Sequence, residues 1–188
     1  MKLDVTMNTD EIDYFKDFLS KLKPDSKFIE WGSGGSTTLF LDYFADKKLV
    51  SIEHNETWYD KVTEAIADEP NRDSLQYLFI PPNQSLDFYG YGVPKEENPT
   101  FNDEYINPET AFPDVKIFDA DVFLVDGISR GACLATVFAM AKNRDATVFI
   151  HDYAGREDWY RWATNLYPKI EQVGSTLLKL SMADKKHK

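Results

Sequence analysis

Apolar residues follow two different spacings along this chain. Short runs of apolar residues are typical of strands, whereas apolar residues spaced three or four apart are typical of amphipathic helices. The short runs predict strands at residues 27–31, 49–52, 75–80, 122–125 and 147–150. The longer spacing predicts helices at residues 9–22, 36–44, 56–67, 128–143 and 156–166. Two last runs, 170–173 and 177–180, flank Gly174-Ser175 and predict a hairpin.

Predicted strands and helices alternate through most of the sequence, which indicates a mostly parallel sheet with helices on both faces. With 188 residues, of which 43% are hydrophobic, the chain can bury one sizeable core. We therefore expect a single α/β domain over residues 1–188. Sheets of this kind bind their ligands beyond the carboxyl ends of the strands, where the strand order reverses.

The alternation is interrupted by a segment rich in proline and aromatic residues, residues 81–113. An insert this long is uncommon in a compact domain unless it forms a lid or a binding loop. Its aromatic residues have two interpretations: they stack on a bound ring, or they pin the loop to the sheet. The residues concerned are Tyr89, Tyr91, Phe101 and Tyr105.

Charge and composition exclude several classes of protein. A formal net charge of -11 argues against a nucleic-acid surface and against binding to anionic membranes. No apolar run approaches the roughly 20 residues needed to span a bilayer, and residues 1–4 lack the apolar core of a secretory signal. The single cysteine, Cys133, excludes an internal disulfide. We expect a soluble cytoplasmic protein.

Candidate chemistry begins directly after the first predicted strand, at Gly32-Ser33-Gly34-Gly35-Ser36. Glycines let the backbone bend tightly and approach a ligand, and the helix that follows offers unpaired N–H groups. Glu53 ends the second predicted strand, where its carboxylate can accept hydrogen bonds from the hydroxyls of a ribose. The two features together predict a site for an adenosine ligand.

The identity of that ligand depends on Thr37 and Glu30. The dinucleotide fingerprint requires a third glycine where this chain has Thr37. Glu30 lies two residues before the glycines, where a carboxylate would repel a pyrophosphate but would suit an ammonium or a sulfonium. The residues favour a ligand with a positively charged end, and an NAD(P)-dependent oxidoreductase of Rossmann type is the alternative.

The pattern Glu30-x-Gly32-x-Gly34-Gly35-Ser36 resembles motif I of the class I S-adenosylmethionine-dependent methyltransferases, with Ser36 where many members have a third glycine. Glu53 matches their ribose-binding acid, and the terminal hairpin resembles the reversed last strand of their seven-stranded sheet. The resemblance implies a Rossmann-like fold, mostly parallel, with a C-terminal antiparallel hairpin. It implies that S-adenosyl-L-methionine is bound by Glu30, Gly32, Ser33, Gly34, Gly35, Ser36, Glu53, His54 and Asp126.

Residues 123–130 and 148–153 are similar to a narrower branch of this family, which includes the glucuronoxylan 4-O-methyltransferases. That similarity implies O-methylation of a sugar, a glycan or another small hydroxylated acceptor. A module that binds the cofactor without catalysis is an alternative, because a fold does not fix a function.

The acceptor side is predicted at the ends of the fourth and fifth strands, where Asp126, His151 and Asp152 should line one mouth. His151 can act as general base, since the ordinary pKa of histidine is about 6.5. Alternatively, Asp126 and Asp152 hold a divalent cation such as Mg²⁺, because hard cations prefer carboxylate oxygens. In a third interpretation the acids only bind the cofactor or cap helices. Arg130 either clamps an acidic substrate group or pairs with a carboxylate.

Overall fold

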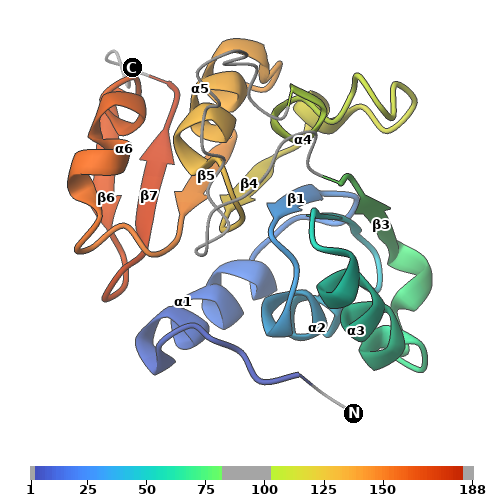
Figure 1. The fold of residues 1–188 in the computed structure, drawn as a ribbon. Coiled ribbons are helices and arrows are strands. Elements are labelled where there is room, and N and C mark those ends of the chain that lie inside the picture. Colours follow the sequence, from blue (N-terminus) through green and yellow to red (C-terminus); the bar gives the residue numbers. More distant parts are fainter. Residues whose placement is uncertain (1–2, 82–102, 184–188) are drawn as a thin grey trace.

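The computed structural model describes residues 3–81 and 103–183. Seven strands form one sheet in the order β3-β2-β1-β4-β5-β7-β6 (Figure 1). The strands are β1 (Lys27–Trp31), β2 (Lys48–Glu53), β3 (Leu75–Phe79), β4 (Val122–Val125), β5 (Thr147–Ile150), β6 (Lys169–Gln172) and β7 (Leu178–Ser181). The helices are α1 (Thr9–Ser20), α2 (Gly35–Leu41), α3 (Glu56–Ile66), α4 (Asp103–Ile106), α5 (Arg130–Met140) and α6 (Glu157–Thr164).

The sheet confirms the predicted fold class. Strands β1 to β5 pair in parallel, whereas β7 lies antiparallel between β5 and β6. Strands β1, β4 and β5 have the predicted bounds. Helix α4 and two short 3₁₀ turns, Arg72–Ser74 and Ile117–Asp119, were not predicted.

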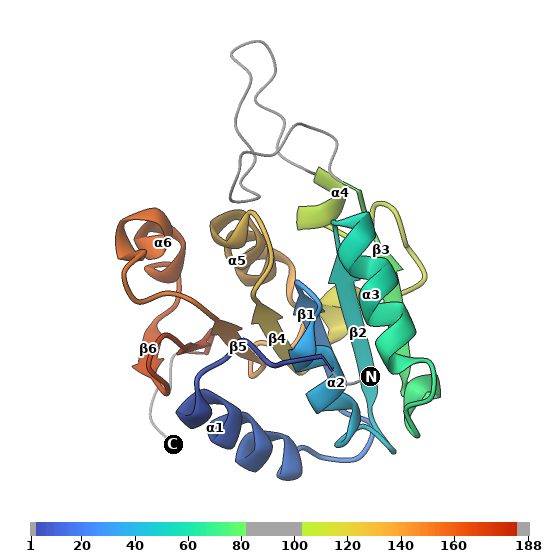
Figure 2. The ribbon, with the colours of Figure 1, turned by 60° about the horizontal axis from the view of Figure 1, so that its bottom comes forward.

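Helices cover both faces of the sheet, and Figure 2 shows α1 and α2 on one side and α5 and α6 on the other. Successive strand residues point to opposite faces, so β1 contributes to two separate apolar clusters. Phe28 packs with residues of α1, α2 and α3. Ile29 and Trp31 belong to the cluster that contains residues of α5 and α6. The sheet is therefore fixed rigidly from both sides.

Tyr105, in α4, shows how the described end of the 81–113 insert is attached. Its side chain is completely buried, and its backbone carbonyl accepts a hydrogen bond from Trp31 Nε1 at 2.8 Å. For Tyr105 this supports the interpretation that the aromatic residues pin the insert to the sheet. Tyr89, Tyr91 and Phe101 lie outside the described residues.

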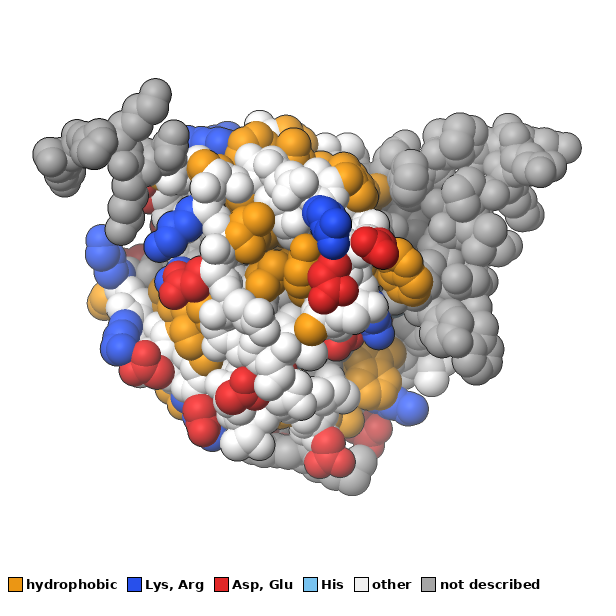
Figure 3. Space-filling model, turned by 90° about the vertical axis from the view of Figure 1, so that its left-hand side faces the viewer, with side chains coloured by type: hydrophobic (Ala, Val, Ile, Leu, Met, Phe, Trp, Pro, Cys, Tyr) orange, Lys and Arg blue, Asp and Glu red, His pale blue; other side chains and the backbone are white. Residues whose placement is uncertain are grey.

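The face formed by α6 and β6 carries several exposed apolar side chains among charged ones (Figure 3). Trp159 and Trp162 of α6 are 55% and 57% exposed, and Ile170 of β6 is 45% exposed.

In the described part of the chain, no helix has both the length and the apolar character required to cross a membrane.

Candidate active site

A cavity of about 680 Å³ opens at the carboxyl ends of the central strands. The turns after β1, β2, β4 and β5 form its walls, as expected for a sheet whose order reverses at β1 and β4. Every predicted site residue except Glu30 lines this cavity. These residues are Gly32, Ser33, Gly34, Gly35, Ser36, Glu53, His54, Asp126, Arg130, His151 and Asp152.

The glycine turn packs against the turn that follows β4. Gly32 has φ +88°, and a Cβ atom at this position would lie 2.6 Å from both Cα and N of Gly127. At Gly35, a Cβ atom would collide with the backbone of Asp4, because residues 3–7 run across the turn. Glycine is therefore required at both positions by close backbone approach. The N-terminal segment contributes Thr6 to the cavity wall.

Glu53 lies at the cavity wall with its carboxylate surrounded by donors. The backbone N–H groups of Ser33, His54 and Asn55 donate to it at 2.8–3.1 Å, and so does the Ser33 hydroxyl at 2.8 Å. Burial by itself would raise the pKa of Glu53, but the donors from His54, Asn55 and Ser33 hold this pKa below its usual value. Glu53 is therefore an ionised acceptor at neutral pH.

Glu30 is the predicted residue that the structure does not bring to the cavity. Its side chain is completely buried behind the glycine turn. The hydroxyls of Ser36, Thr37 and Ser51 donate to its carboxylate at 2.5–2.6 Å. These hydroxyls enclose the carboxylate, and Glu30 does not line the cavity, so its contact with a cofactor stays a prediction. Glu30 ties the start of α2 to β1 and β2.

Trp58 covers the glycine turn from α3. Its Nε1 atom donates to the Ser33 carbonyl at 2.6 Å, and its indole lines the cavity. Tyr59 does not line the cavity and stacks on Tyr77 with ring centroids 4.3 Å apart. A hydroxyl contact of 2.6 Å joins Tyr77 to Ser33, so aromatic residues support the turn from behind.

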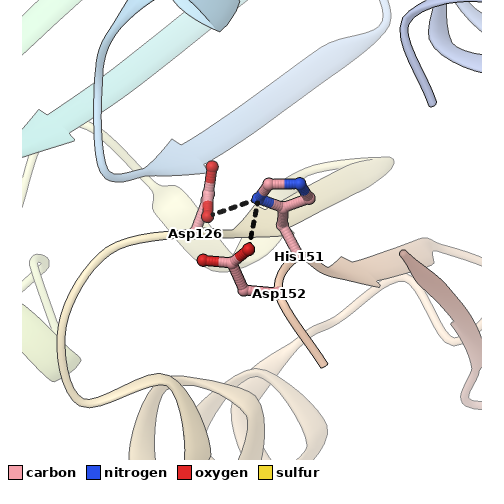
Figure 4. A group of neighbouring side chains, drawn as sticks. All are labelled: Asp126, His151 and Asp152. Atoms are coloured by element: carbon pink, nitrogen blue, oxygen red, sulfur yellow. Dashed lines mark hydrogen bonds and ion pairs between the residues drawn. The ribbon is translucent and has the colours of Figure 1, made fainter. Parts of the chain in front are cut away.

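Asp126, His151 and Asp152 come together at the ends of β4 and β5, as predicted. Figure 4 shows the two carboxylates turned toward the same ring nitrogen of His151. His151 Nδ1 lies 2.9 Å from Asp126 Oδ1 and 3.9 Å from Asp152 Oδ1. Asp152 adopts φ +56°, a conformation that aspartate tolerates better than most residues. This left-handed backbone places its carboxylate beside that of Asp126.

The remaining nitrogen of His151 contacts a residue that sequence reasoning missed. His151 Nε2 lies 3.1 Å from Oε2 of Glu11, a completely buried residue of α1. Burial would lower the pKa of His151, but Asp126, Asp152 and Glu11 together raise it to about 9. In this arrangement the carboxylates favour the cationic form of His151 at neutral pH, and the general-base role stays a prediction. Nothing near Glu11 in sequence signals the contact, since 140 residues separate the two partners.

Arg130 joins the acidic cluster to the backbone. Its guanidinium lies 3.3 Å from Asp126 and 3.4 Å from Asp152, and it donates to the carbonyls of Gly127 and His151. Of the two predicted roles, pairing with carboxylates is the one that the structure displays. Its planar group fixes the turns after β4 and β5 relative to each other.

The same cluster offers donors to a cation. One ligand atom each from Asp126, His151 and Asp152 lies within 4.8 Å of the others. Two carboxylates and one imidazole suit a divalent metal, although the charges of Arg130 and of Arg156, 3.4 Å from Asp152, oppose one. A metal at His151 Nδ1 would also have to replace the proton there.

No protein-family model and no curated protein sequence matches this chain. Among solved structures, a methyltransferase-like protein from Silicibacter pomeroyi is similar, with 19% identity, a TM-score of 0.69, and 96% of this chain and 89% of that chain covered. An S-adenosylmethionine-dependent O-methyltransferase from Thermotoga maritima is 8% identical, with a TM-score of 0.64. The match covers 100% of this chain and 70% of that chain. The MycE methyltransferase of the mycinamycin pathway, in complex with Mg and SAH, has 11% identity and a TM-score of 0.54, covering 91% and 45%. The chain therefore has the seven-stranded fold of these methyltransferases.

Proposed function

We propose that this protein transfers a methyl group from S-adenosylmethionine to a hydroxyl group of a small acceptor. The observation that carries the proposal is the composition of one cavity. A glycine turn and an ionised Glu53 line one part of it, and Asp126, His151 and Asp152 line the adjoining part. A donor site and an acceptor site thus share one space.

The residues of the first part fit the methyl donor. The glycine turn presents backbone without side chains to the cavity. At Gly34 the Trp58 ring lies close to the turn, since a Cβ atom there would be 3.7 Å from it. Glu53 supplies an ionised acceptor for ribose hydroxyls, and Trp58 supplies an aromatic surface. S-adenosylmethionine, when bound, supplies a methyl group that its sulfonium has already activated. The chain has only to hold and orient the reactants.

The residues of the second part fit the handling of a hydroxyl. An acceptor hydroxyl beside Asp126 or Asp152 can donate its hydrogen bond to a carboxylate oxygen. The carboxylate would take the proton along this bond as the hydroxyl oxygen bonds to the methyl carbon; the bond from that carbon to sulfur would break, and S-adenosylhomocysteine would leave. His151 and Arg130 hold these carboxylates in place by direct contact. A divalent cation at the cluster would assist by lowering the pKa of the hydroxyl.

A sugar or glycan is the acceptor class that we favour. The part of the cavity that we assign to the acceptor is lined by hydrogen-bonding side chains, those of Asp126, Arg130, His151 and Asp152. Several hydroxyl groups on one acceptor could use such a wall, whereas an apolar acceptor would leave it unsatisfied. The similarity of residues 123–130 and 148–153 to polysaccharide O-methyltransferases agrees with this choice.

Calorimetry with S-adenosylhomocysteine, S-adenosylmethionine and NAD separates this function from its rivals. We expect both methionine-derived ligands to bind and NAD not to bind. Tight NAD binding without a response to the other two would overturn the proposal. If the methyl donor binds but a panel of sugars and phenols is not methylated, the module without catalysis becomes the better interpretation.

Two matched variants locate the binding. Glu53→Gln removes the ionised acceptor and should weaken S-adenosylhomocysteine binding on the order of tenfold. Asp121→Asn is the control. Asp121 also accepts a backbone N–H, from Lys27 at 3.0 Å, but it lies at the amino ends of β1 and β4, away from the cavity. We expect this control to bind like the wild type. Equal loss in both variants would mean that the ligand does not contact Glu53.

A further inference from the structure

Glu11 is held in one position by four different groups. Its Oε1 atom accepts from the backbone N–H of Thr176 at 2.6 Å and from the Thr176 hydroxyl at 2.9 Å. Its Oε2 atom accepts from the backbone N–H of Asn8 at 2.9 Å and faces His151 Nε2 at 3.1 Å. The turn between β6 and β7 contains Gly174, where any Cβ atom would collide with the Glu11 side chain. The carboxylate therefore has a built site in the fold.

The protonation of the facing nitrogen follows from these partners. Both oxygens of Glu11 already accept backbone N–H groups, Oε1 from Thr176 and Oε2 from Asn8, as the oxygens of a carboxylate do. An ionised carboxylate can only accept hydrogen bonds. His151 Nε2 must therefore carry a hydrogen and donate it to Glu11. The ring orientation that results directs Nδ1 to the cavity edge, 2.9 Å from Asp126.

We propose that Glu11 is a positioning residue of the site, which reserves Nε2 of His151 as a permanent donor and leaves Nδ1 to act at the cavity. Glu11 does not line the cavity, so it acts only through His151. Helix α1 thereby becomes part of the reaction site, although its other contacts are those of a packing helix. The contact between Glu11 and His151 does not depend on the proposed function. Only the statement that a reaction takes place in this cavity rests on it.

The arrangement holds for either occupant of Nδ1. With a proton there, His151 donates to Asp126 and to Glu11 at once. With a cation there, a metal-bound imidazole needs an acceptor for its other N–H, which is the role that carboxylates fill behind metal-binding histidines. The remaining charged groups near His151 are Asp152 after β5 and Arg130 of α5. Both lie on the cavity side of the ring.

A purely structural role for Glu11 is the competing explanation, because the residue also joins α1 to the β6–β7 turn. The chain offers a control for this role in the neighbouring residue. Asp10 accepts from the backbone N–H and hydroxyl of Ser175, at 2.8 and 2.9 Å, and joins the same helix to the same turn. Asp10→Asn therefore weakens this connection without altering a contact to His151.

Nitrogen NMR of the histidine side chains tests the proposal. In the wild type, the His151 Nε2–H should be present and should exchange slowly with water, with His151→Gln used for assignment. In Glu11→Gln, the amide oxygen is expected to face Thr176, which offers a backbone N–H at 2.6 Å and a hydroxyl, rather than Asn8, whose backbone N–H alone donates at 2.9 Å. The amide NH₂ then faces His151, which must give up its Nε2 hydrogen. We expect loss of the Nε2–H signal, which leaves a neutral ring protonated at Nδ1 alone.

The possible outcomes are distinct. Loss of the Nε2–H signal in Glu11→Gln but not in Asp10→Asn supports the proposal. An unchanged signal in Glu11→Gln overturns it, and so does loss to the same extent in both variants. Absence of a slowly exchanging Nε2–H in the wild type also overturns it, and that measurement needs no variant.

The consequence for activity is measured separately. Glu11→Gln should lower kcat for methyl transfer on the order of tenfold, the usual effect of a supporting residue behind a functional histidine. The Kd for S-adenosylhomocysteine should stay within about threefold of the wild type, since a threefold change is under 1 kcal/mol. If the wild type shows the NMR signature but binds no S-adenosylhomocysteine, the proposed function fails while the positioning role of Glu11 stands.

Discussion

Gly32 and Gly127 touch through their backbones, so that the turn after β1 rests directly on the turn after β4. This contact places the predicted methyl-donor residues beside Asp126. A side chain fits at neither glycine, since a Cβ at Gly32 would lie 2.6 Å from the Gly127 backbone and a Cβ at Gly127 would collide with the Tyr105 hydroxyl group. The two halves of the site therefore lie this close together because both positions are glycine.

The first prediction concerns Gly32→Ala. The substitution forces alanine into φ +88° and pushes a Cβ atom to 2.6 Å from the Gly127 backbone. We expect a loss of about 3 kcal/mol or more in the free energy of unfolding, measured with urea, together with loss of S-adenosylhomocysteine binding. Gly155→Ala is the control: it has φ +80° but would meet no atom within 4 Å. The control should lose only about 1 kcal/mol, for the backbone conformation; equal losses in the two variants would exclude the collision as the cause.

The second prediction concerns the pH dependence of stability at Glu30. Burial raises the pKa of Glu30 from 4.5 to about 7, against the opposing effect of its three hydroxyl donors. The folded protein therefore keeps this proton to higher pH than the unfolded chain does. Stabilisation from this group is complete below about pH 4.5 and is lost as the pH rises to 7.

Glu30→Gln removes that titration. Urea unfolding of both proteins between pH 4.5 and 8 measures the effect. The stability of the wild type relative to Glu30→Gln should fall by roughly 3 kcal/mol over this range, from 1.36 kcal/mol for each pKa unit. A difference that does not change with pH would show that Glu30 titrates normally.

The third prediction concerns His151. Its pKa is raised like that of Glu30, but for a histidine a raised pKa favours the charged form instead of the neutral one. Burial opposes the charged form, but the carboxylates around the ring raise the pKa of His151 from 6.5 to about 9. The folded protein binds this proton more tightly, so the stabilisation is complete below about pH 6.5 and is lost as the pH approaches and passes 9. The stability advantage of the wild type over His151→Gln should be larger at pH 6 than at pH 10, by roughly 3 kcal/mol. An advantage that grows with pH would contradict the imidazolium.

The fourth prediction concerns a metal at the acidic cluster. A cation that uses His151 Nδ1 must displace its proton. Below the pKa of about 9, the affinity for the cation should therefore rise about tenfold for each unit by which the pH is raised. Calorimetry with Mn²⁺ should then give roughly 100-fold tighter binding at pH 8.5 than at pH 6.5. Asp152→Asn should weaken it at both pH values. Affinity that is independent of pH would exclude His151 as a ligand.

The sequence was sufficient for the strands that run through the centre of the sheet. Strands β1, β4 and β5 are covered on both faces, so most of their residues are apolar and mark the strands in the sequence. The glycine turn and Glu53 could be placed at the cavity because parallel strands deliver their carboxyl ends to one edge. Local pattern and sheet topology together determine these features.

The partners of Glu11 and Glu30 could not be found from the sequence, for a physical reason. Glutamate is rarely buried unless it is paired, so an acidic residue in an amphipathic helix is taken as exposed. The groups that satisfy Glu11 come from Thr176 and His151, 165 and 140 residues away. The hydroxyl of Ser51, which helps to enclose Glu30, lies on the neighbouring strand. Burial of a charge depends on such distant donors, which no local spacing reveals.

The antiparallel strand β7 determines when the sheet can be completed during synthesis. Strand β5 pairs with β4 on one side, and on its other side it pairs with residues 178–181 of β7. A nascent chain that stops short of Leu178 exposes the unpaired backbone groups of β5 beside buried residues such as Phe149. Such an edge can pair with another chain. The protein therefore depends on its last described strand to escape aggregation while it folds.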